Sequence, residues 1–206
     1  MTKQVFKGET LTRTKVKNNI LRIWYMTSEE DRHDWYQEAY DFAESLARTM
    51  GAYNYQHKLK NVSKVCGVIA ALSPMKRWEN NKVIAEDLIN TGTCGHTKTF
   101  VKKAQDVLAS DGSDEAILDI LNGNKISAFY LNIRYPDEAK VMTIDRHALS
   151  IALGRWVTDN QEMSMTKGQY EFFVQCYIMA AMQVGVSPLL MQSATWTKWR
   201  TIKQEY

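Results

Sequence analysis

The sequence predicts an almost wholly helical protein. Its 206 residues include only three prolines and ten glycines, too few for the many tight turns of an all-β fold. Residue types that favour helix are abundant, and apolar residues recur at the three- to four-residue spacing of amphipathic helices. Hydrophobic residues make up 45% of the chain, which is enough to bury a core, so we expect one helical domain over residues 1–206.

The predicted helices follow one another with recognisable start and stop signals. The first begins near Ser28, where acidic residues follow a capping side chain, and ends at Gly51. The second, residues 59–72, is so apolar that we expect it to be the most buried helix, and Pro74 limits it. Further helices are predicted over 77–89, 100–108, 113–121 and 168–184, and as segments that begin at Lys125, Asp145 and Pro188.

The total charge leaves the class of partner open. A net charge of +3 at pH 7 neither requires nor excludes a nucleic-acid partner. Basic residues concentrate near the N-terminus, but such a cluster is more often a solvated helix face than a phosphate site. This cluster comprises Lys3, Lys7, Arg13, Lys15, Lys17 and Arg22.

Cysteine usage and hydropathy predict a cytoplasmic protein. Cys66, Cys94 and Cys176 are odd in number and widely spaced, which disfavours a disulfide scaffold, a structural zinc or an iron–sulfur cluster, so no cofactor is expected. The most apolar stretch, residues 172–186, is too short to span a bilayer, so we expect no membrane association. A bacterial or phage-infected cell is the expected setting, because the chain is compact and lacks a cysteine cluster.

Two short motifs carry the chemistry. Lys125 follows a turn at Gly123, and Asp145 opens a later helix, each at a predicted helix start. An amine beside a carboxylate can perform imine chemistry at a sugar carbon, because the amine attacks and the carboxylate stabilises the developing cation. The alternative is structural, since such pairs are often surface ion pairs and aspartate often caps helices.

The order of four motifs resembles the helix-hairpin-helix DNA glycosylase superfamily, of the endonuclease III type, over about residues 60–155. Residues 68–74, Val-Ile-Ala-Ala-Leu-Ser-Pro, and the following Asn81-Lys82 resemble the family's buried helix and its Asn-Lys helix. Residues 99–108 resemble its short Lys-Ala helix. Residues 121–128, Leu-Asn-Gly-Asn-Lys-Ile-Ser-Ala, are similar to the Leu-Pro-Gly-x-Gly-x-Lys-Thr-Ala hairpin, and residues 143–147 to the Val-Asp-x-His motif.

The resemblance implies an all-α, helix-hairpin-helix glycosylase-like fold with a central cleft. In this fold Lys125 would be the amine nucleophile and Asp145 the catalytic carboxylate. The glycosylase-like core would be residues 60–155, flanked by residues 1–59 and 156–206 as a possible second lobe. The expected partner is double-stranded DNA, bound by a monomer. DNA contacts would come from the hairpin and from the helix after Pro74: Asn122, Gly123, Asn124, Ser127, Trp78, Asn81 and Lys82.

The chain departs from the family pattern in the hairpin. The hairpin is one or two residues shorter, lacks the second glycine and has Asn122 in place of proline. The family glycines bring backbone N–H groups close to a phosphate, so only Gly123 can still do so. Many relatives also carry a C-terminal cysteine cluster that binds an iron–sulfur centre, which this chain lacks.

A base-excision enzyme must flip its target base and fill the gap, which requires an apolar pocket or wedge. Candidates are Pro74 and Met75, with Trp78, and each can instead be ordinary core packing. His147 is a candidate for the pocket or for a hydrogen bond at the helix start. Trp196, Lys198, Trp199 and Arg200 form an aromatic and basic run that can stack on nucleic acid, although a core-facing helix gives the same pattern.

Three function classes follow. The first is a DNA glycosylase, with possible lyase activity at abasic sites through a lysine imine. The second is a catalytically inactive nucleic-acid-binding protein on the same scaffold, as the altered hairpin would allow. The third is a helical interaction protein in which Lys125 and Asp145 have a structural role. A neutral lysine is needed for the lyase step, and burial or a nearby cation such as Arg134 or Arg146 would favour it. The identity of the base is not encoded in local pattern.

Overall fold

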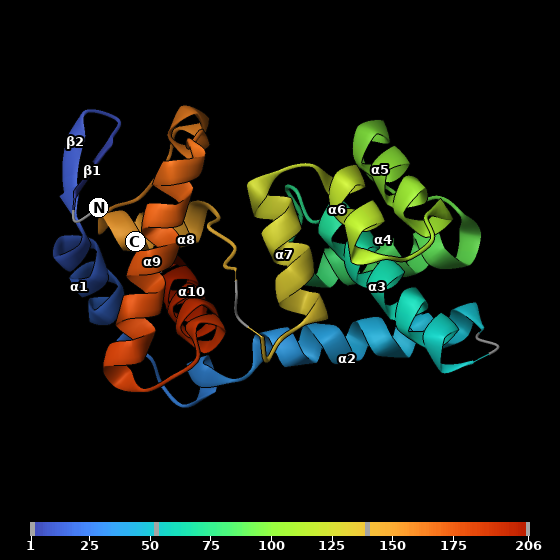
Figure 1. Ribbon diagram of the computed structural model, residues 1–206. Coiled ribbons are helices and arrows are strands. Elements are labelled where there is room, and N and C mark those ends of the chain that lie inside the picture. Colours follow the sequence, from blue (N-terminus) through green and yellow to red (C-terminus); the bar gives the residue numbers. More distant parts are fainter. Residues whose placement is uncertain (1–2, 52–53, 139–140, 205–206) are drawn as a thin grey trace. The chain divides into compact units, whose positions relative to one another are not determined.

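The computed structural model describes residues 3–51, 54–138 and 141–204. The chain forms two compact units: Met1–Tyr36 together with Asp137–Tyr206, and Gln37–Pro136. The second unit is therefore one continuous segment, whereas the first is assembled from both ends of the chain (Figure 1). The sequence grouped residues 60–155 into one core, but the second unit ends at Pro136, before the helix that Asp145 opens.

The first unit combines N-terminal and C-terminal elements, which lie side by side as blue and orange-red segments in Figure 1. Its N-terminal half begins with an antiparallel hairpin and continues into a helix and a single 3₁₀ turn. Its C-terminal half contains three helices. The elements are β1 (Lys3–Phe6), β2 (Glu9–Thr12), α1 (Arg13–Trp24), η1 (Glu30–Arg32), α8 (Arg146–Leu153), η3 (Asn160–Met163), α9 (Lys167–Val184) and α10 (Pro188–Gln204).

The second unit is helical throughout its described residues. A long helix crosses the boundary from the first unit, and five further helices follow. They are α2 (Trp35–Ala47), followed by the 3₁₀ turn η2 (Arg48–Met50), then α3 (Tyr55–Leu72), α4 (Trp78–Thr91), α5 (Lys98–Ala109), α6 (Asp114–Leu121) and α7 (Asn124–Arg134).

The helical fold class is confirmed, and most predicted helix ends lie within a few residues of the observed ones. Ser113 caps α6 by accepting a hydrogen bond from the Ala116 N–H, and Asp145 caps α8 in the same way at Ala148. Gly92 ends α4 in the left-handed conformation. These signals act within a few residues, which is why the sequence alone locates them.

The N-terminal region differs from the prediction in two ways. The hairpin of β1 and β2 turns at Lys7-Gly8, where both residues have positive φ, the geometry that suits a two-residue hairpin. The start predicted at Ser28 is wrong for the long helix. Ser28 and Asp31 bond to each other around η1 only, and α2 begins at Trp35.

The core of the first unit lies between α1, α8, α9 and α10. Val16 and Ile20 of α1 are fully buried, and Phe6 of β1 packs edge-on against Phe173 of α9 with ring centroids 5.3 Å apart. The hairpin therefore belongs to the core. Burial of these side chains from both chain ends stabilises the joining of the two segments.

The core of the second unit is organised around α3. Every residue of α3 from Val65 to Leu72 is buried, as are Val62 and Ser63, in agreement with the prediction for the most apolar helix. Gly67 lets α5 and α6 pack closely against α3, because a Cβ there would lie 2.7 Å from the Val107 side chain and 2.9 Å from the Ile117 side chain.

Cys66, Cys94 and Cys176 are free thiols. No single helix among the described residues has the length and hydropathy of a membrane span. The helices α9 and α10 have them only when they are counted together, and the pair is bent by 97°.

Candidate functional site

The predicted hairpin is present between α6 and α7. Its left-handed residue is Asn122, with φ of 43°, whereas Gly123 has an extended φ of 167°. A Cβ on Gly123 would make only an ordinary contact, 3.5 Å from the Ile126 side chain. The turn is thus centred on Asn122, a residue type that tolerates this conformation, and the fold itself does not require a glycine at 123.

Lys125 is the second residue of α7 and is exposed. Within the described residues its ammonium group has no ion pair. The neighbouring Asn122 and Asn124 are also exposed, and Ser127 is half-buried, with its N–H donating to the Gly123 carbonyl at 2.9 Å. The hairpin therefore presents residues 122–125 to solvent, whereas Ser127 is partly covered.

The cation partner predicted for Lys125 is not Arg134. Arg134 lies nine residues along α7, about 13 Å along the helix axis. Its guanidinium donates to the Ser63 hydroxyl of α3 at 2.9 Å and stacks on Tyr135. Arg134 joins α7 to the core of its unit, and the burial expected around Lys125 is absent, since that side chain is exposed.

Asp145 is the N-cap of α8 and is half-buried. One carboxylate oxygen, Oδ1, accepts a hydrogen bond from the Ala148 N–H at 2.8 Å. The other, Oδ2, accepts one from the indole Nε1 of Trp196 on α10 at 3.2 Å. Both oxygens are oriented, one by its own helix and one by a helix more than forty residues later in the chain.

The segment that leads into Asp145 is irregular, and side chains from α9 and α10 satisfy its backbone groups. The Tyr170 hydroxyl donates to the Met142 carbonyl at 2.6 Å and accepts from the Ile144 N–H at 3.0 Å. The Gln192 amide donates to the Thr143 carbonyl at 2.6 Å. Buried backbone groups outside regular structure need such partners, and these bonds fix the position of residues 142–144.

Buried phenols surround this segment. The Tyr177 hydroxyl donates to the Ala148 carbonyl at 2.9 Å, and the Tyr36 hydroxyl donates to Gln192 at 3.2 Å. Burial raises the pKa of Tyr170 to about 12, with the nearby charge of Asp145 acting in the same direction. Burial and the Asp145 charge likewise raise the pKa of Tyr36 and of Tyr177. The three phenols are neutral hydrogen-bonding groups at neutral pH.

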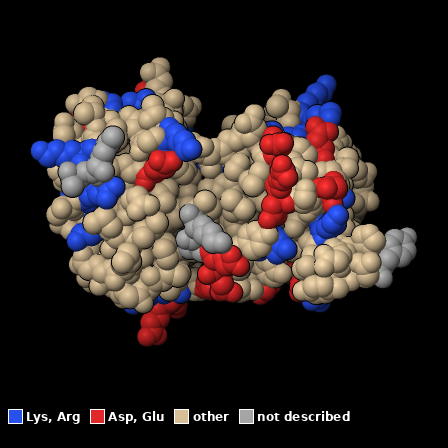
Figure 2. Space-filling view, in the orientation of Figure 1, with Lys and Arg blue, Asp and Glu red and all other residues tan. Residues whose placement is uncertain are grey.

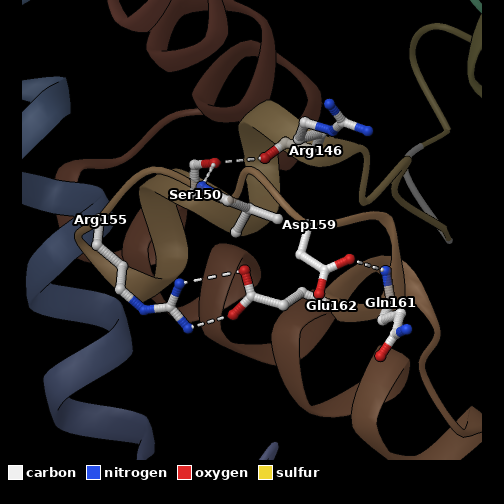
Figure 3. Close-up of polar contacts among 7 residues, drawn as sticks. Arg146, Ser150, Arg155, Asp159, Gln161 and Glu162 are labelled. Carbon is white, nitrogen blue, oxygen red and sulfur yellow. Dashed lines mark hydrogen bonds and ion pairs between the residues drawn. The ribbon is translucent and has the colours of Figure 1, made fainter.

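The connection after α8 is also held by side chains (Figure 3). Arg155 forms two hydrogen bonds with Glu162, at 2.6 and 3.2 Å, and this pairing lowers the pKa of the Glu162 carboxyl. The Ser150 hydroxyl donates to the Arg146 carbonyl and accepts from the Val157 N–H. Arg146 itself pairs through its guanidinium with Asn160. These contacts fix the connection that follows α8.

Aromatic and basic side chains surround the Trp196 ring, whose indole N–H donates to the Asp145 carboxylate. His147 meets the Trp196 ring edge-on, with centroids 6.0 Å apart, and Trp35 lies 6.2 Å from the same ring. The Arg200 guanidinium lies over the Trp196 ring at 4.6 Å. Trp199, by contrast, is buried in the core against Trp156. The C-terminal aromatic run therefore divides: Trp199 packs internally and Trp196 contacts Asp145.

Asn81 is wrongly assigned as a DNA contact. It is 2% exposed, and its side-chain amide donates to the Ile69 carbonyl near the end of α3 at 3.0 Å. Carbonyls in the last turn of a helix have no N–H partner within that helix. The Asn81 side chain supplies one and so links α4 to α3. Lys82 is half-buried, pairs with Glu79 at 2.7 Å and lies 5.6 Å from the Trp78 ring. Trp78 is half-buried and packs edge-on against Phe42 of α2.

The loop between α3 and α4 presents Met75. This side chain is 84% exposed, and its φ of 61° lies in the left-handed region that disfavours methionine. The loop is held in place by His96, which bonds to the half-buried Pro74 at its carbonyl, and by Lys76, whose ammonium donates to the Gly95 carbonyl. An exposed apolar side chain on a strained, supported loop is the arrangement expected of a wedge.

Charged side chains of both signs are interspersed on each unit in the view of Figure 2, and basic residues form no continuous stripe on that face. No group of three or more histidine, cysteine or acidic residues in the described part of the chain could hold a metal ion. The surface charge in this view therefore does not single out a phosphate-binding face.

A family model described as "Family of unknown function (DUF7178)" matches residues 2–203. The chain belongs to this family. No curated protein and no solved structure matches it. Within this DUF7178 chain, Lys125 belongs to the second unit and Asp145 to the first, each at the start of its helix. The sequence analysis did not connect Trp196, Gln192 and Tyr170 with Asp145. The signal that could have found them is a polar atom on each side chain, placed on otherwise apolar helices, with Gln192 and Trp196 one helical turn apart.

Proposed function

We propose that this protein is a DNA base-excision enzyme that breaks the N-glycosidic bond of a damaged or modified base and can cleave abasic sites through a lysine imine. The observation that carries the proposal is that Lys125 and Asp145 each lie at a helix start with a side chain that solvent reaches. These are the two groups that the resemblance to helix-hairpin-helix glycosylases assigns to catalysis.

The two residues have separate tasks. As the bond between the base and C1′ breaks and the base leaves with the bonding electrons, positive charge develops at C1′, and the Asp145 carboxylate stabilises it. Water attack on C1′ then completes simple base release. In the lyase reaction the Lys125 amine, having lost a proton, attacks the C1′ aldehyde of the abasic site, and water leaves as the imine forms. The imine permits loss of a C2′ proton and elimination of the phosphate from C3′, which cleaves the strand.

Two further observations support DNA as the partner. Gly123 is not required by its own backbone conformation, and a glycine that the fold does not need is expected where a ligand backbone approaches closely. Met75 is exposed and conformationally strained, and apolar wedges of this type enter gaps between bases. Both lie in the second unit, the same unit as Lys125.

Covalent trapping tests the lyase reaction. Wild-type protein incubated with duplex DNA containing an abasic site and a borohydride reductant should form a stable protein–DNA adduct, and Lys125→Ala should abolish it. Lys98→Ala is the matched control, because Lys98 is likewise an exposed lysine in the first turn of a helix in the same unit. Equal trapping by Lys125→Ala would exclude Lys125 as the nucleophile.

Base release tests Asp145. Asparagine caps helices about as well as aspartate, so Asp145→Asn should keep the helix start while removing the negative charge. We expect single-turnover base release to fall at least a hundredfold while DNA affinity is retained, measured on duplexes that carry single modified bases. Unchanged base release in this variant would remove Asp145 from the mechanism.

One observation favours the second candidate, a binding protein without lyase activity. Lys125 is exposed, so the buried lysine that the lyase reaction was predicted to use is absent. This candidate predicts duplex binding that weakens steeply between 50 and about 200 mM salt, with no product and no trapped adduct. Salt-dependent binding without turnover on any modified duplex would select it.

A further inference from the structure

Side chains of α9 and α10 bond to the backbone of the irregular segment that leads into α8. Tyr170 of α9 bonds to Met142 and Ile144, and Gln192 of α10 bonds to Thr143. Gln192 is in turn bonded by the buried Tyr36 hydroxyl. The backbone on the N-terminal side of Asp145 is thus bonded by two long side chains, Tyr170 and Gln192, and Tyr36 supports Gln192.

The carboxylate itself is fixed by α10. Gln192 and Trp196 are four residues apart and therefore lie on one face of that helix. Gln192 holds the backbone at Thr143 while the Trp196 indole N–H holds Oδ2 of Asp145 at 3.2 Å. One helix face thus fixes both the main chain and the reactive group.

Trp196 is held in turn by its own neighbours. His147 packs edge-on at 6.0 Å, Trp35 lies at 6.2 Å and the Arg200 guanidinium covers the ring at 4.6 Å. A donor whose own position is fixed can aim a carboxylate, whereas a mobile donor cannot. A capping bond to Ala148 alone would leave Oδ2 free to choose other partners.

We propose that Trp196 is a positioning residue that aims the Asp145 carboxylate, through the indole N–H bond to Oδ2. This inference rests on the proposed role of Asp145 in base release, but the hydrogen bond itself exists or fails independently of any activity. Trp196 does not touch the reacting sugar in this proposal; it acts through Asp145. Misplacing a reacting group by about 1 Å can reduce a rate a hundredfold, so loss of the aiming bond should be measurable.

Nuclear magnetic resonance tests the hydrogen bond in the whole protein. The chain has six tryptophans, and in ¹⁵N-labelled protein the indole N–H signal missing from Trp196→Phe identifies Trp196. Asp145→Asn should move that signal more than any other indole signal. Trp199, whose indole nitrogen is buried without a partner among the described residues, is the internal control and should move little. A Trp196 signal that moves no more than that of Trp199 would overturn the proposal.

Single-turnover base release tests the aiming role. Trp196→Phe keeps an aromatic ring but removes the donor, and we expect the rate to fall about tenfold to a hundredfold with DNA affinity within about twofold of wild type. Trp199→Phe is the matched control, the same substitution three residues away, and should keep the wild-type rate. Wild-type rate in Trp196→Phe would refute the positioning role.

The two proposals fail in distinguishable ways. If no modified duplex loses its base with wild-type protein, but the Trp196 signal responds to Asp145→Asn, base excision is excluded and the positioning bond stands. If wild-type protein is active but Trp196→Phe is equally active, Asp145 keeps its role and Trp196 loses its own.

Discussion

At the scale of single residues, the structure separates side chains that build the fold from those that face solvent. Asn81 and Met75 illustrate the difference, since both were candidates for contact with DNA. Asn81 is buried and satisfies a helix-end carbonyl, whereas Met75 is exposed on a strained turn. Residue type and position along the chain were equally suggestive in both cases, and burial distinguished them.

Asn81→Ala should destabilise the protein by about 1–3 kcal/mol, because it leaves the buried Ile69 carbonyl without its partner. Asn80→Ala, an exposed neighbour in the same helix, should change stability by less than about 0.5 kcal/mol. Urea unfolding of both variants measures the difference. Equal, small effects would mean that the Asn81 bond contributes nothing to stability.

Substitutions at Met75 separate strain from function. Met75→Gly removes the left-handed strain and should stabilise the fold by about 1 kcal/mol, whereas Met75→Ala keeps most of the strain. Both remove the exposed side chain, so both should weaken base release if Met75 is the wedge. Full activity in both variants, measured on the same modified duplex, would leave Met75 as a strained surface residue only.

The buried phenol of Tyr170 gives the fold a pH dependence on the alkaline side. Folding raises its pKa from 10.0 to about 12. The phenol's contribution to the free energy of unfolding is therefore complete below pH 10 and is lost as the pH rises through about 12. A shift of about two pKa units corresponds to about 3 kcal/mol in the free energy of unfolding. Tyr170→Phe should be less stable at neutral pH, because two hydrogen bonds are lost, but its stability should fall less steeply above pH 10. Equal slopes in urea unfolding series would contradict this.

At the scale of secondary-structure elements, packing in the second unit depends on the close approach of α5 and α6 to α3 at Gly67. Gly67→Ala would place a Cβ 2.7 Å from Val107, so we expect destabilisation by about 1–3 kcal/mol. Gly168→Ala in α9 is the matched control, because nothing lies within 4 Å of its Cβ position. That control should be neutral or stabilising by up to about 1 kcal/mol. Thermal unfolding of both variants checks the contrast.

The elements also show where sequence patterns sufficed. The hydrophobic period located α3, and capping residues located the starts of α6 and α8. The same kind of signal misled at Ser28, where a capping side chain serves only the short turn η1. The hairpin of β1 and β2 was missed, although Lys7-Gly8 between alternating residues is a typical two-residue turn.

At the scale of the whole molecule, the chain contains one continuous unit and one assembled from both ends. A fragment of residues 34–136, which keeps α2 intact, should fold alone with helical circular dichroism and a cooperative thermal transition, because α3 supplies its core. A fragment of residues 1–136 should keep that unit but leave α1 without α9, so amides of α1 should exchange rapidly with solvent. Protected α1 amides in that fragment, or an unfolded 34–136 fragment, would contradict this organisation.

The sequence by itself determined the helical class, most helix limits and the placement of Lys125 and Asp145 at helix starts. Helix caps, turn residues and the spacing of apolar residues depend on only a few neighbouring residues, so they can be recognised in the sequence without knowing the tertiary structure. Only the tertiary structure decided that Asn81 is interior, that Lys125 is exposed and that Trp196 donates to Asp145. Burial and such long-range bonds arise because packing brings distant residues together, and no local pattern carries that information.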